Sequence, residues 1–398
     1  MSIVDRWLLP DGVEEVLPPE AQKLEAVRRQ LLDQFQTWGY QLVIPPMVEF
    51  LESLLTGTGT DLDLKTFKVT DQVSGRMMGI RADITPQVAR IDAHSLNQPG
   101  NVRLCYAGTV LHAKADNMLA SRTPISVGAE LFGDTGRAGD LEIVSLMTES
   151  VNAISNTSPH IELGDVGIFR QLVQMADLSE VDEEALFDLI QSKALPDLSE
   201  RVLSLGLSRD MAELVTSLPT LCGDAVVLVK ARQLFSNYPA LLERLDNLEA
   251  VAKGLTERFK SLDIYYDLSE LRGYNYHTGI VFAAFLRSAG RRVAKGGRYD
   301  DVGEVFGRAR GATGFDIDLK TLATLIEIAP QTTHKIAAPV LNEGESGDVS
   351  RNVSHVVVGR WQKICELRAK GYIVVEDSVE GCTKQIIERN GQWQLVDI

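Results

Sequence analysis

The sequence predicts an α+β fold in which a sheet is flanked by helices, carries a helical insert and is followed by a small α/β domain. Three observations favour this class. Strand and helix patterns alternate through the first 132 residues. The stretch from about residue 166 to residue 260 is then helical in pattern and rich in aspartate and glutamate. Strand patterns return at 264–268 and 280–285, before a short α/β pattern closes the chain.

The N-terminal part supplies the first helix and three strands. Apolar residues recur at helical spacing over residues 18–38, and Gly39 follows as a stop signal. Residues 40–44 form a strand pattern that ends at two prolines. Residues 66–69 and 77–81 are predicted to be strands joined by a serine–glycine turn.

A second helix and two further strands follow. We expect this helix to have Thr85 as its N-cap and Pro86 at its first position. Residues 101–111 and 125–132 are predicted strands joined by a polar loop. The pair Gly296-Gly297, much later in the chain, is expected to form a tight turn.

The C-terminal part predicts a second, smaller domain. Within the helical insert before it, one apolar stripe comprises Leu241, Leu245, Leu248, Val251, Leu255 and Phe259. Residues 342–352 are polar and indicate a linker. Beyond them we expect a strand at 356–358, a helix at 364–370 and a strand at 372–375. The predicted domains are therefore 1–330, with the insert at about 166–260, and 331–398.

Composition limits the classes of function. No stretch of eighteen apolar residues occurs, and the first six residues lack the pattern of a secretory signal. The 4 cysteines and 6 histidines are scattered without metal-ligand spacing, so we expect no metal, no cofactor, no disulfide framework and a cytoplasmic location. The net charge of −15 argues against tRNA binding, since phosphate neutralisation needs a basic surface.

Four segments together resemble the histidyl-tRNA synthetase family, whose catalytic core is a class II synthetase sheet of antiparallel strands flanked by helices. Each segment alone is a weak signal, and the four in the family's order are a strong one. The resemblance spans roughly residues 5 to 325. The segments are 9–18, 81–90, 105–133 and a last one that joins 270–279, 295–300 and 314–319.

The chain departs from that family at the positions that grip ATP. By resemblance, His112 replaces an arginine that holds the α-phosphate, and Lys114 replaces a glutamate two residues later. Thr321 replaces the arginine that meets the γ-phosphate, and Asp318 adds a negative charge where the family has glycine. Charged hydrogen bonds contribute about 1.5–3 kcal/mol each, so losing two costs roughly 3–6 kcal/mol, about 10²–10⁴ in rate or affinity. We therefore expect no amino-acid activation.

The positions that hold histidine in that family are better kept. The resemblance implies that Glu130 accepts an imidazole N–H and that Arg272 lies near the ligand carboxylate. A carboxylate for the ammonium, a guanidinium for the carboxylate and an acceptor for the ring suit free histidine. Ser126 replaces a glutamine and His277 replaces a tyrosine, which are departures within the pocket. The implied histidine-binding residues are Asp83, Thr85, Glu130, Arg272, Tyr276, His277 and Tyr299.

Each of these residues also has a structural interpretation. Asp83 and Thr85 are good helix-capping residues. Glu130 and Arg272 are alternatively a buried ion pair inherited from an ancestor, and the two tyrosines are alternatively plain core aromatics. The side chains of His112 and Lys114 are expected to be solvated, since no phosphate needs them.

A synthetase core without an ATP grip, followed by a reduced C-terminal domain, resembles the ATP phosphoribosyltransferase regulatory subunit family. The resemblance implies a subunit without chemistry of its own, acting in the first step of histidine biosynthesis. It implies a short-form catalytic subunit as partner, a homodimer within a hetero-octamer of four plus four, and L-histidine as the allosteric ligand. Neither tRNA nor a membrane is an expected partner. The alternatives are a stand-alone histidine-binding scaffold and an active histidyl-tRNA synthetase.

Overall fold

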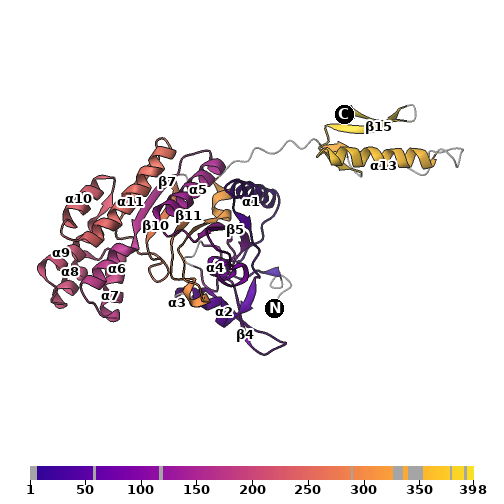
Figure 1. The fold of residues 1–398 in the computed structure, drawn as a ribbon. Coiled ribbons are helices and arrows are strands. Elements are labelled where there is room, and N and C mark those ends of the chain that lie inside the picture. Colours follow the sequence, from indigo (N-terminus) through magenta and orange to yellow (C-terminus); the bar gives the residue numbers. More distant parts are fainter. Residues whose placement is uncertain are drawn as a thin grey trace. The chain divides into compact units, whose positions relative to one another are not determined.

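The computed structural model divides the chain into two compact units, residues 1–326 and residues 327–398 (Figure 1). The predicted boundary at residue 330 falls within 326–334, which lies outside the described residues. The described residues are 7–56, 60–115, 120–287, 290–325, 335–338, 353–376, 379–389 and 392–398.

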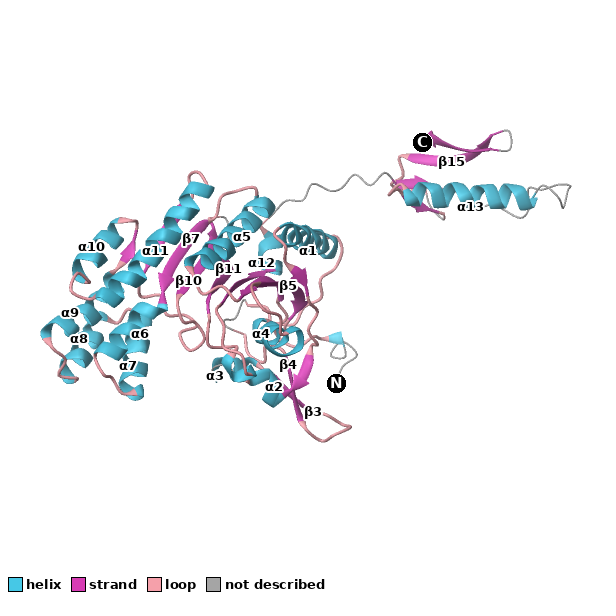
Figure 2. Ribbon diagram, in the orientation of Figure 1, coloured by secondary structure: helices cyan, strands magenta, loops and turns pink. Residues whose placement is uncertain are grey.

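The first unit is organised by a sheet of nine strands (Figure 2). Across the sheet, in order, these are β1 (Gln41–Leu42), β5 (Val102–Thr109), β6 (Ile125–Phe132), β12 (Ala312–Asp318), β11 (Arg291–Arg298), β10 (Ile280–Leu286), β7 (His160–Asp165), β9 (Asp263–Asp267) and β8 (Cys222–Gly223). The predicted α+β class and the strands at 101–111, 125–132, 264–268 and 280–285 are confirmed.

The sheet is mixed, whereas the family resemblance implied antiparallel strands. Six of its eight neighbouring pairs are antiparallel, but β1–β5 and β7–β9 are parallel. A parallel pair needs a crossover connection, and the helical insert provides it between β7 and β9. The antiparallel strands β6, β12, β11 and β10 form the middle of the sheet.

Helices cover one face of this sheet and leave the other face for a site. They are α1 (Glu20–Thr37), α5 (Arg137–Ser155) and α12 (Leu319–Thr324). Phe35 of α1 packs edge-on against Phe315 of β12, with ring centroids 5.7 Å apart. Because side chains alternate along a strand, Ala129 and Phe315 face the helices while Glu130 and Gly314 face the opposite side.

A three-stranded sheet in the order β2-β4-β3 lies in the N-terminal part of this unit, and it confirms the predicted strand pair. The predicted strand at 40–44 is reduced to β1, although the Val43 N–H still donates to the Cys105 carbonyl at 2.9 Å. Pro45 and Pro46, which have no N–H, prevent the pairing from continuing further. The elements here are β2 (Val48–Phe50), α2 (Leu51–Leu55), α3 (Thr60–Lys65), β3 (Phe67–Thr70), β4 (Met77–Ile80), α4 (Thr85–Arg90) and a π-helical turn, η2 (Ile91–Leu96).

Two local predictions are wrong. Ile84 precedes α4, so Thr85 and Pro86 are its first and second residues, and the Thr85 hydroxyl is directed elsewhere. Gly296 and Gly297 lie inside β11 and do not form a turn. A Cβ on Gly296 would stand 2.2 Å from the carbonyl oxygen of Gly314, so glycine is required by the close approach of β12.

The predicted helical insert is confirmed (Figure 1). Its apolar stripe lies on α11, where Leu241, Leu245, Leu248, Val251 and Leu255 are buried. The insert contains α6 (Val166–Met175), α7 (Glu180–Gln191), α8 (Leu195–Ser204), α9 (Arg209–Ser217), the 3-10 turn η3 (Leu218–Thr220), the short β8, α10 (Val226–Leu234) and α11 (Pro239–Arg258). A further 3-10 turn, η4 (Glu304–Phe306), precedes β12.

The second unit is a small α/β domain with a four-stranded sheet in the order β14-β13-β15-β16. Its elements are β13 (Lys335–Ala337), α13 (Val353–Ala369), β14 (Ile373–Val375), β15 (Lys384–Arg389) and β16 (Gln392–Asp397). The strand predicted at 356–358 is instead part of α13, because packing of Ile364 and Leu367 outweighs the weak strand preference of three valines. The predicted linker at 342–352 lies outside the described residues.

Among the helices that the structure describes, none is both long enough and apolar enough to cross a membrane.

Candidate functional site

A buried carboxyl group, that of Glu130 on β6, is the centre of the site. The residue is 1% exposed. Its Oε1 accepts hydrogen bonds from the hydroxyls of Thr85, at 2.9 Å, and Tyr106, at 3.2 Å. The Tyr299 hydroxyl donates to Oε2. These three hydroxyls satisfy a group that would otherwise be costly to bury.

Two glycines, one on the neighbouring strand β12 and one on β6 itself, make room for this carboxyl and its hydroxyl partners. Gly314 stands directly opposite Glu130 in the β12–β6 register. A Cβ on Gly314 would lie 1.5 Å from Glu130 Oε2, which no side chain can tolerate. Gly128 plays a similar part, since its Cβ would stand 2.4 Å from the Tyr106 hydroxyl.

The surroundings favour the protonated form of Glu130. Burial raises the pKa of its carboxyl to about 8, although the hydroxyl of Tyr299 acts in the opposite direction. Burial also raises the pKa of Tyr106 and that of Tyr299 well above the ordinary value, so both remain hydroxyl donors. Near neutral pH the carboxyl is therefore mostly protonated, and one of the three hydroxyls then accepts a hydrogen bond from it instead of donating one.

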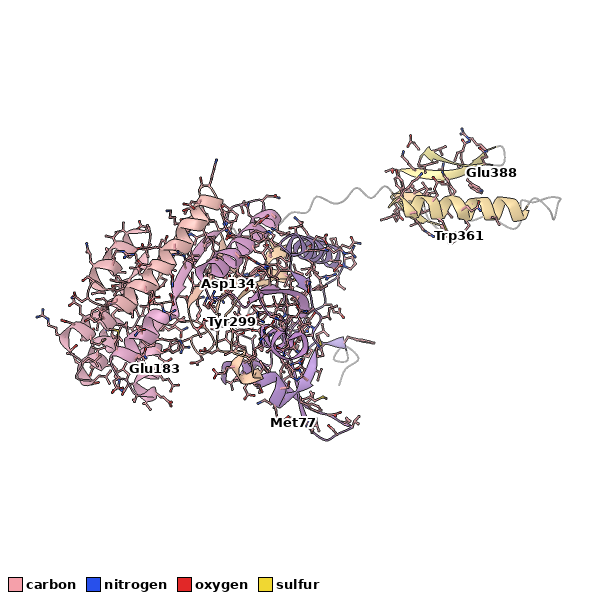
Figure 3. All side chains as sticks on the ribbon, viewed as in Figure 1. Met77, Asp134, Glu183, Tyr299, Trp361 and Glu388 are labelled. Atoms are coloured by element: carbon pink, nitrogen blue, oxygen red, sulfur yellow. The ribbon has the colours of Figure 1, made fainter. Side chains whose placement is uncertain are left out.

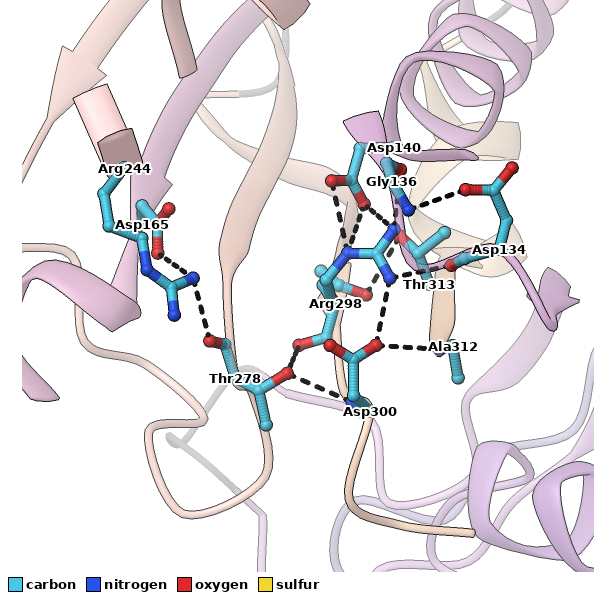
Figure 4. Close-up of polar contacts among 11 residues, drawn as sticks. Asp134, Gly136, Asp140, Asp165, Arg244, Thr278, Arg298, Asp300, Ala312 and Thr313 are labelled. Atoms are coloured by element: carbon cyan, nitrogen blue, oxygen red, sulfur yellow. Dashed lines mark hydrogen bonds and ion pairs between the residues drawn. The ribbon is translucent and has the colours of Figure 1, made fainter. Parts of the chain in front are cut away.

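A network of hydrogen bonds surrounds Arg298, the residue before Tyr299 (Figure 4). The Arg298 side chain is buried, and its Nε donates to Asp140 Oδ1 at 3.0 Å. Its Nη1 donates to the Asp134 carbonyl and to Asp300 Oδ1, both at 2.9 Å. Nη2 donates to the Gly136 carbonyl at 3.0 Å. These bonds join the end of β11 to the start of α5, which fixes the residue that follows Arg298.

A cavity of about 890 Å³ opens beside Glu130 on the face of the sheet away from α1 and α5. Tyr299 lies in the interior of the first unit, whereas Glu183 lies on the helical insert (Figure 3). All seven residues predicted for a histidine site line this cavity: Asp83, Thr85, Glu130, Arg272, Tyr276, His277 and Tyr299.

Two tyrosines form an aromatic wall of the cavity. The rings of Tyr276 and Tyr299 lie 4.9 Å apart at an interplanar angle of 31°. The Tyr276 hydroxyl is buried and has no hydrogen-bond partner among the described residues. Buried hydroxyls usually have a hydrogen-bond partner, so this atom is a candidate to bond a ligand or a water molecule.

Asp83 caps the start of α4, whereas the Thr85 side chain belongs to the site around Glu130. The Asp83 carboxylate accepts from the backbone N–H of Thr85 at 3.1 Å, which is a capping contact at the start of α4. The Thr85 hydroxyl instead donates to Glu130. The capping interpretation thus holds for Asp83 and not for the Thr85 side chain.

Arg272 pairs with two glutamates and not with Glu130, so the alternative of a Glu130–Arg272 ion pair is wrong. Its Nε donates to Glu270 at 2.8 Å, and its Nη2 donates to Glu162 Oε1 at 3.0 Å. The Arg272 side chain is 47% exposed. Hydrogen bonding to Glu270 raises the pKa of Arg272. Burial raises the pKa of Glu162, and in Glu270 the bonds from Arg272 outweigh burial and lower the pKa.

The His277 ring is held between two glycines. Cβ atoms on Gly273 and Gly297 would each stand 2.7 Å from ring atoms of His277. Burial lowers the pKa of His277 to about 4, so the ring is neutral near pH 7. Its Nδ1 is buried without a partner among the described residues.

Several residues of the cavity wall were not predicted. Arg292, Lys295 and Asp316 come from the central strands. Tyr106 of β5, which does not line the cavity but bonds to Glu130, was not predicted either. Alternation along a strand would have placed Tyr106 near Glu130 once the β5–β6 register was known. The carboxylates that α7 contributes depend on how the insert folds back, and no local pattern signals that. These are Glu180, Glu183, Glu184 and Asp188.

A second cavity of about 630 Å³ is lined by two of the three positions at which the resemblance implied that ATP-binding side chains have been replaced. His112 donates from Nε2 to the Ala82 carbonyl at 3.0 Å, so its side chain is bonded and not simply solvated as expected. The Thr321 hydroxyl donates to Asp318 at 2.6 Å and thereby closes the start of α12. Lys114 is exposed and does not line this cavity, whereas Ser126 does.

Among the described residues, no group of three histidine, cysteine, aspartate or glutamate side chains is arranged to hold a metal ion.

Comparison with known proteins first defines the class. The histidyl-tRNA synthetase family model matches residues 12–322. A crystal structure described as an ATP phosphoribosyltransferase regulatory subunit/histidyl-tRNA synthetase from Bacillus halodurans superposes with a TM-score of 0.79 at 25% identity, covering 95% of this chain and 94% of that one. A histidyl-tRNA synthetase from Nostoc sp. shows the same fold, with a TM-score of 0.74 at 16% identity over 98% of this chain and 97% of that one. The fold is therefore class II synthetase-like.

Relatives along the whole chain narrow this class. The ATP phosphoribosyltransferase regulatory subunit of Azotobacter vinelandii is 50% identical over 100% of both chains. The protein of the same name from Pseudomonas fluorescens is 48% identical over 99% of each. The chain belongs to the ATP phosphoribosyltransferase regulatory subunit family.

Replacing Gly314 by alanine is expected to lower the free energy of unfolding by about 1–3 kcal/mol or more, because the new Cβ collides with Glu130 Oε2. Gly136→Ala is the matched control, since its Cβ would meet nothing closer than 3.5 Å and its φ of −110° suits alanine. Urea unfolding of both variants measures the difference. Equal stability of the two would contradict the packing described around Glu130.

Glu130→Gln is expected to remove a pH dependence of stability. The carboxyl pKa is about 8 in the folded chain against an ordinary value of 4.5. Between these pH values the folded chain keeps a proton that the unfolded chain releases, so the free energy of unfolding of the native chain falls as pH rises, by up to ~1.4 kcal/mol per unit. The stabilisation that this proton provides is fully present below about pH 4.5 and is lost above about pH 8.

Urea unfolding of the native chain and the glutamine variant at several pH values between 5 and 9 tests this linkage. The stability of the native chain relative to the variant should decline across that range. A difference that stays constant with pH would show that Glu130 is ionised in the folded chain.

Proposed function

We propose that this chain is a non-catalytic regulatory subunit that binds histidine in the Glu130 cavity and controls a separate ATP phosphoribosyltransferase catalytic subunit. One observation carries the proposal. The cavity holds a buried, hydroxyl-supported carboxyl between aromatic rings, while the positions expected to grip ATP carry His112, Lys114 and Thr321.

Histidine suits the chemistry of the cavity. Its imidazole is proposed to lie by the Tyr276 and Tyr299 rings and to exchange a hydrogen bond with Glu130. The Asp83 carboxylate is close enough to the same wall to meet an ammonium group. His277, partly buried and neutral near pH 7, adds a further polar group to the wall. The resemblance assigns the ligand carboxylate to Arg272.

We propose that amino-acid activation is absent. His112 and Thr321 are bonded to Ala82 and Asp318, so neither supplies a guanidinium for a phosphate. Loss of two such contacts costs roughly 3–6 kcal/mol of nucleotide binding. Transfer-RNA binding is likewise not proposed, since residues 331–398 carry eight lysine and arginine side chains against nine acidic ones.

Feedback inhibition by histidine would arise because histidine binding is thermodynamically linked to the equilibrium between the active and inhibited forms of the complex. Histidine must bind the inhibited form of the complex more tightly than the active form, because a ligand shifts an equilibrium only by its differential affinity. A coupling of about 1–3 kcal/mol is typical. The cavity lies between the central sheet and α7 of the helical insert, so a ligand there contacts two parts of the first unit.

We propose that two copies of this chain form a homodimer within a hetero-octamer with four catalytic subunits. Support comes from apolar side chains at the edge of the main sheet, where β1 is the last of the strands that the structure describes. Leu42, Ile44, Met47 and Val48 are 51%, 84%, 45% and 38% exposed. A run of exposed apolar residues beside an unpaired strand edge is typical of a surface that another chain covers.

Turnover of a short-form catalytic subunit tests the regulatory role most broadly. Adding this chain should raise the rate of ATP phosphoribosyltransferase turnover, and histidine should suppress the rate only in the mixture. With Glu130→Ala, about 10-fold more histidine or greater should be needed, because a hydrogen bond to a buried group is removed. Size-exclusion chromatography of the mixture should show co-elution.

The alternatives predict other results in the same assay. Histidine binding by the chain without co-elution or rate change would indicate a stand-alone histidine-binding scaffold. Histidine-dependent exchange of pyrophosphate into ATP would indicate an active histidyl-tRNA synthetase.

Ile44→Asp is expected to convert the homodimer to a monomer, because a charge in the covered apolar surface must be desolvated. Sedimentation velocity of the chain alone measures this change. Val73→Asp is the control, since Val73 is 95% exposed at the turn between β3 and β4 and should leave the mass unaltered. A dimer that persists in the Ile44 variant would place the interface elsewhere.

A further inference from the structure

Arg292 faces the cavity because of an irregularity in β11. In the β10–β11 ladder, Lys295 pairs with Ala283, but Arg292 pairs with Phe285 after a register shift. One extra residue of β11 is therefore accommodated between them, which is a β-bulge. Ala283 and Phe285 lie on one face of β10, since they are two residues apart. Arg292 and Lys295 consequently share that face, although they are three residues apart.

This shared face is the floor of the cavity. Ala283 also pairs with Glu162 of β7, and Lys295 pairs with Asp316 of β12. Without the bulge, alternation would direct Arg292 to the opposite face, toward the helices. Bulges commonly redirect a side chain next to a functional site.

Arg292 also lies between the two cavities and lines both of them. Only a few residues line both of them, and they include two carboxylates and three basic side chains. These residues are Leu62, Lys65, Asp83, Arg292, Lys295 and Asp316. A ligand group bound by Arg292 would thus lie at the end of the amino-acid cavity that adjoins the second cavity.

The guanidinium of Arg292 makes no hydrogen bond and no ion pair with any residue that the structure describes. Arg272 and Arg298 differ, since each is bonded to two carboxylates. Lys295 has Asp316 at 3.8 Å. Arg292 is partly buried, and burial lowers its pKa. A cation that has lost much of its water and has no partner is a position prepared for an anion.

We infer that Arg292, not Arg272, receives the α-carboxylate of the amino-acid ligand. The inference rests on the proposed histidine binding and names the residue that selects an amino acid over an amine. Arg272 is already bonded through Nε and Nη2 to Glu270 and Glu162, so a ligand carboxylate would have to compete with both. Arg292 is bonded to no carboxylate among the described residues, and Asp316, Glu270 and Glu162 act on it only at longer range. Its planar guanidinium suits bidentate binding of a carboxylate.

Calorimetry with histidine and histamine tests this assignment, because histamine keeps the imidazole and the amine and lacks the carboxylate. The titrations use the complex with the catalytic subunit. Arg292→Ala should weaken histidine binding on the order of 10- to 100-fold and leave histamine binding nearly as it was. Arg287→Ala is the matched control, since its side chain is 91% exposed and it should preserve the preference for histidine.

The outcomes separate this inference from the proposed function. Failure of the native complex to bind histidine overturns both. If the native complex binds histidine and Arg292→Ala retains the preference over histamine, only the assignment of Arg292 fails. If Arg272→Ala instead loses the preference for histidine over histamine, Arg272 and not Arg292 binds the ligand carboxylate. Arg292→Lys keeps the charge and should restore part of the preference, which guards against misfolding of the alanine variant.

Discussion

The burial of one carboxyl group inside the central sheet governs the rest of this structure. Glu130 is accommodated only because Gly314 has no side chain and because three hydroxyls reach its oxygens. One of those hydroxyls is fixed by the Arg298 network, and another comes from the first residue of α4. The strands β5, β6 and β12, the start of α4 and the β11–α5 junction are therefore all tied to a single functional group.

The two cavities differ in character. Beside Glu130, buried polar atoms of Tyr276 and His277 have no hydrogen-bond partner among the described residues, which is typical of a wall that a ligand completes. In the second cavity, the side chains of His112 and Thr321 are bonded to neighbours of their own. A regulatory chain needs the first property and has no use for a nucleotide grip, so this contrast accords with its family.

Much of the fold and most of the site could be predicted from the sequence, because motif residues keep their positions relative to the strands. All seven predicted site residues line one cavity. What could not be predicted depends on tertiary pairing. The bulge that redirects Arg292 arises from the β10–β11 register, and the glutamate partners of Arg272 come from β7 and from the chain after β9. The N-cap role predicted for Thr85 and the turn predicted at the glycines of β11 were wrong because the neighbours of these residues in space were unknown.

A crystal structure of this chain with its catalytic subunit and histidine tests the central claim most directly. The account predicts an imidazole nitrogen within hydrogen-bond distance of Glu130, with the ring beside Tyr276 and Tyr299. Histidine bound at a different surface of either subunit, with water alone beside Glu130, would contradict it.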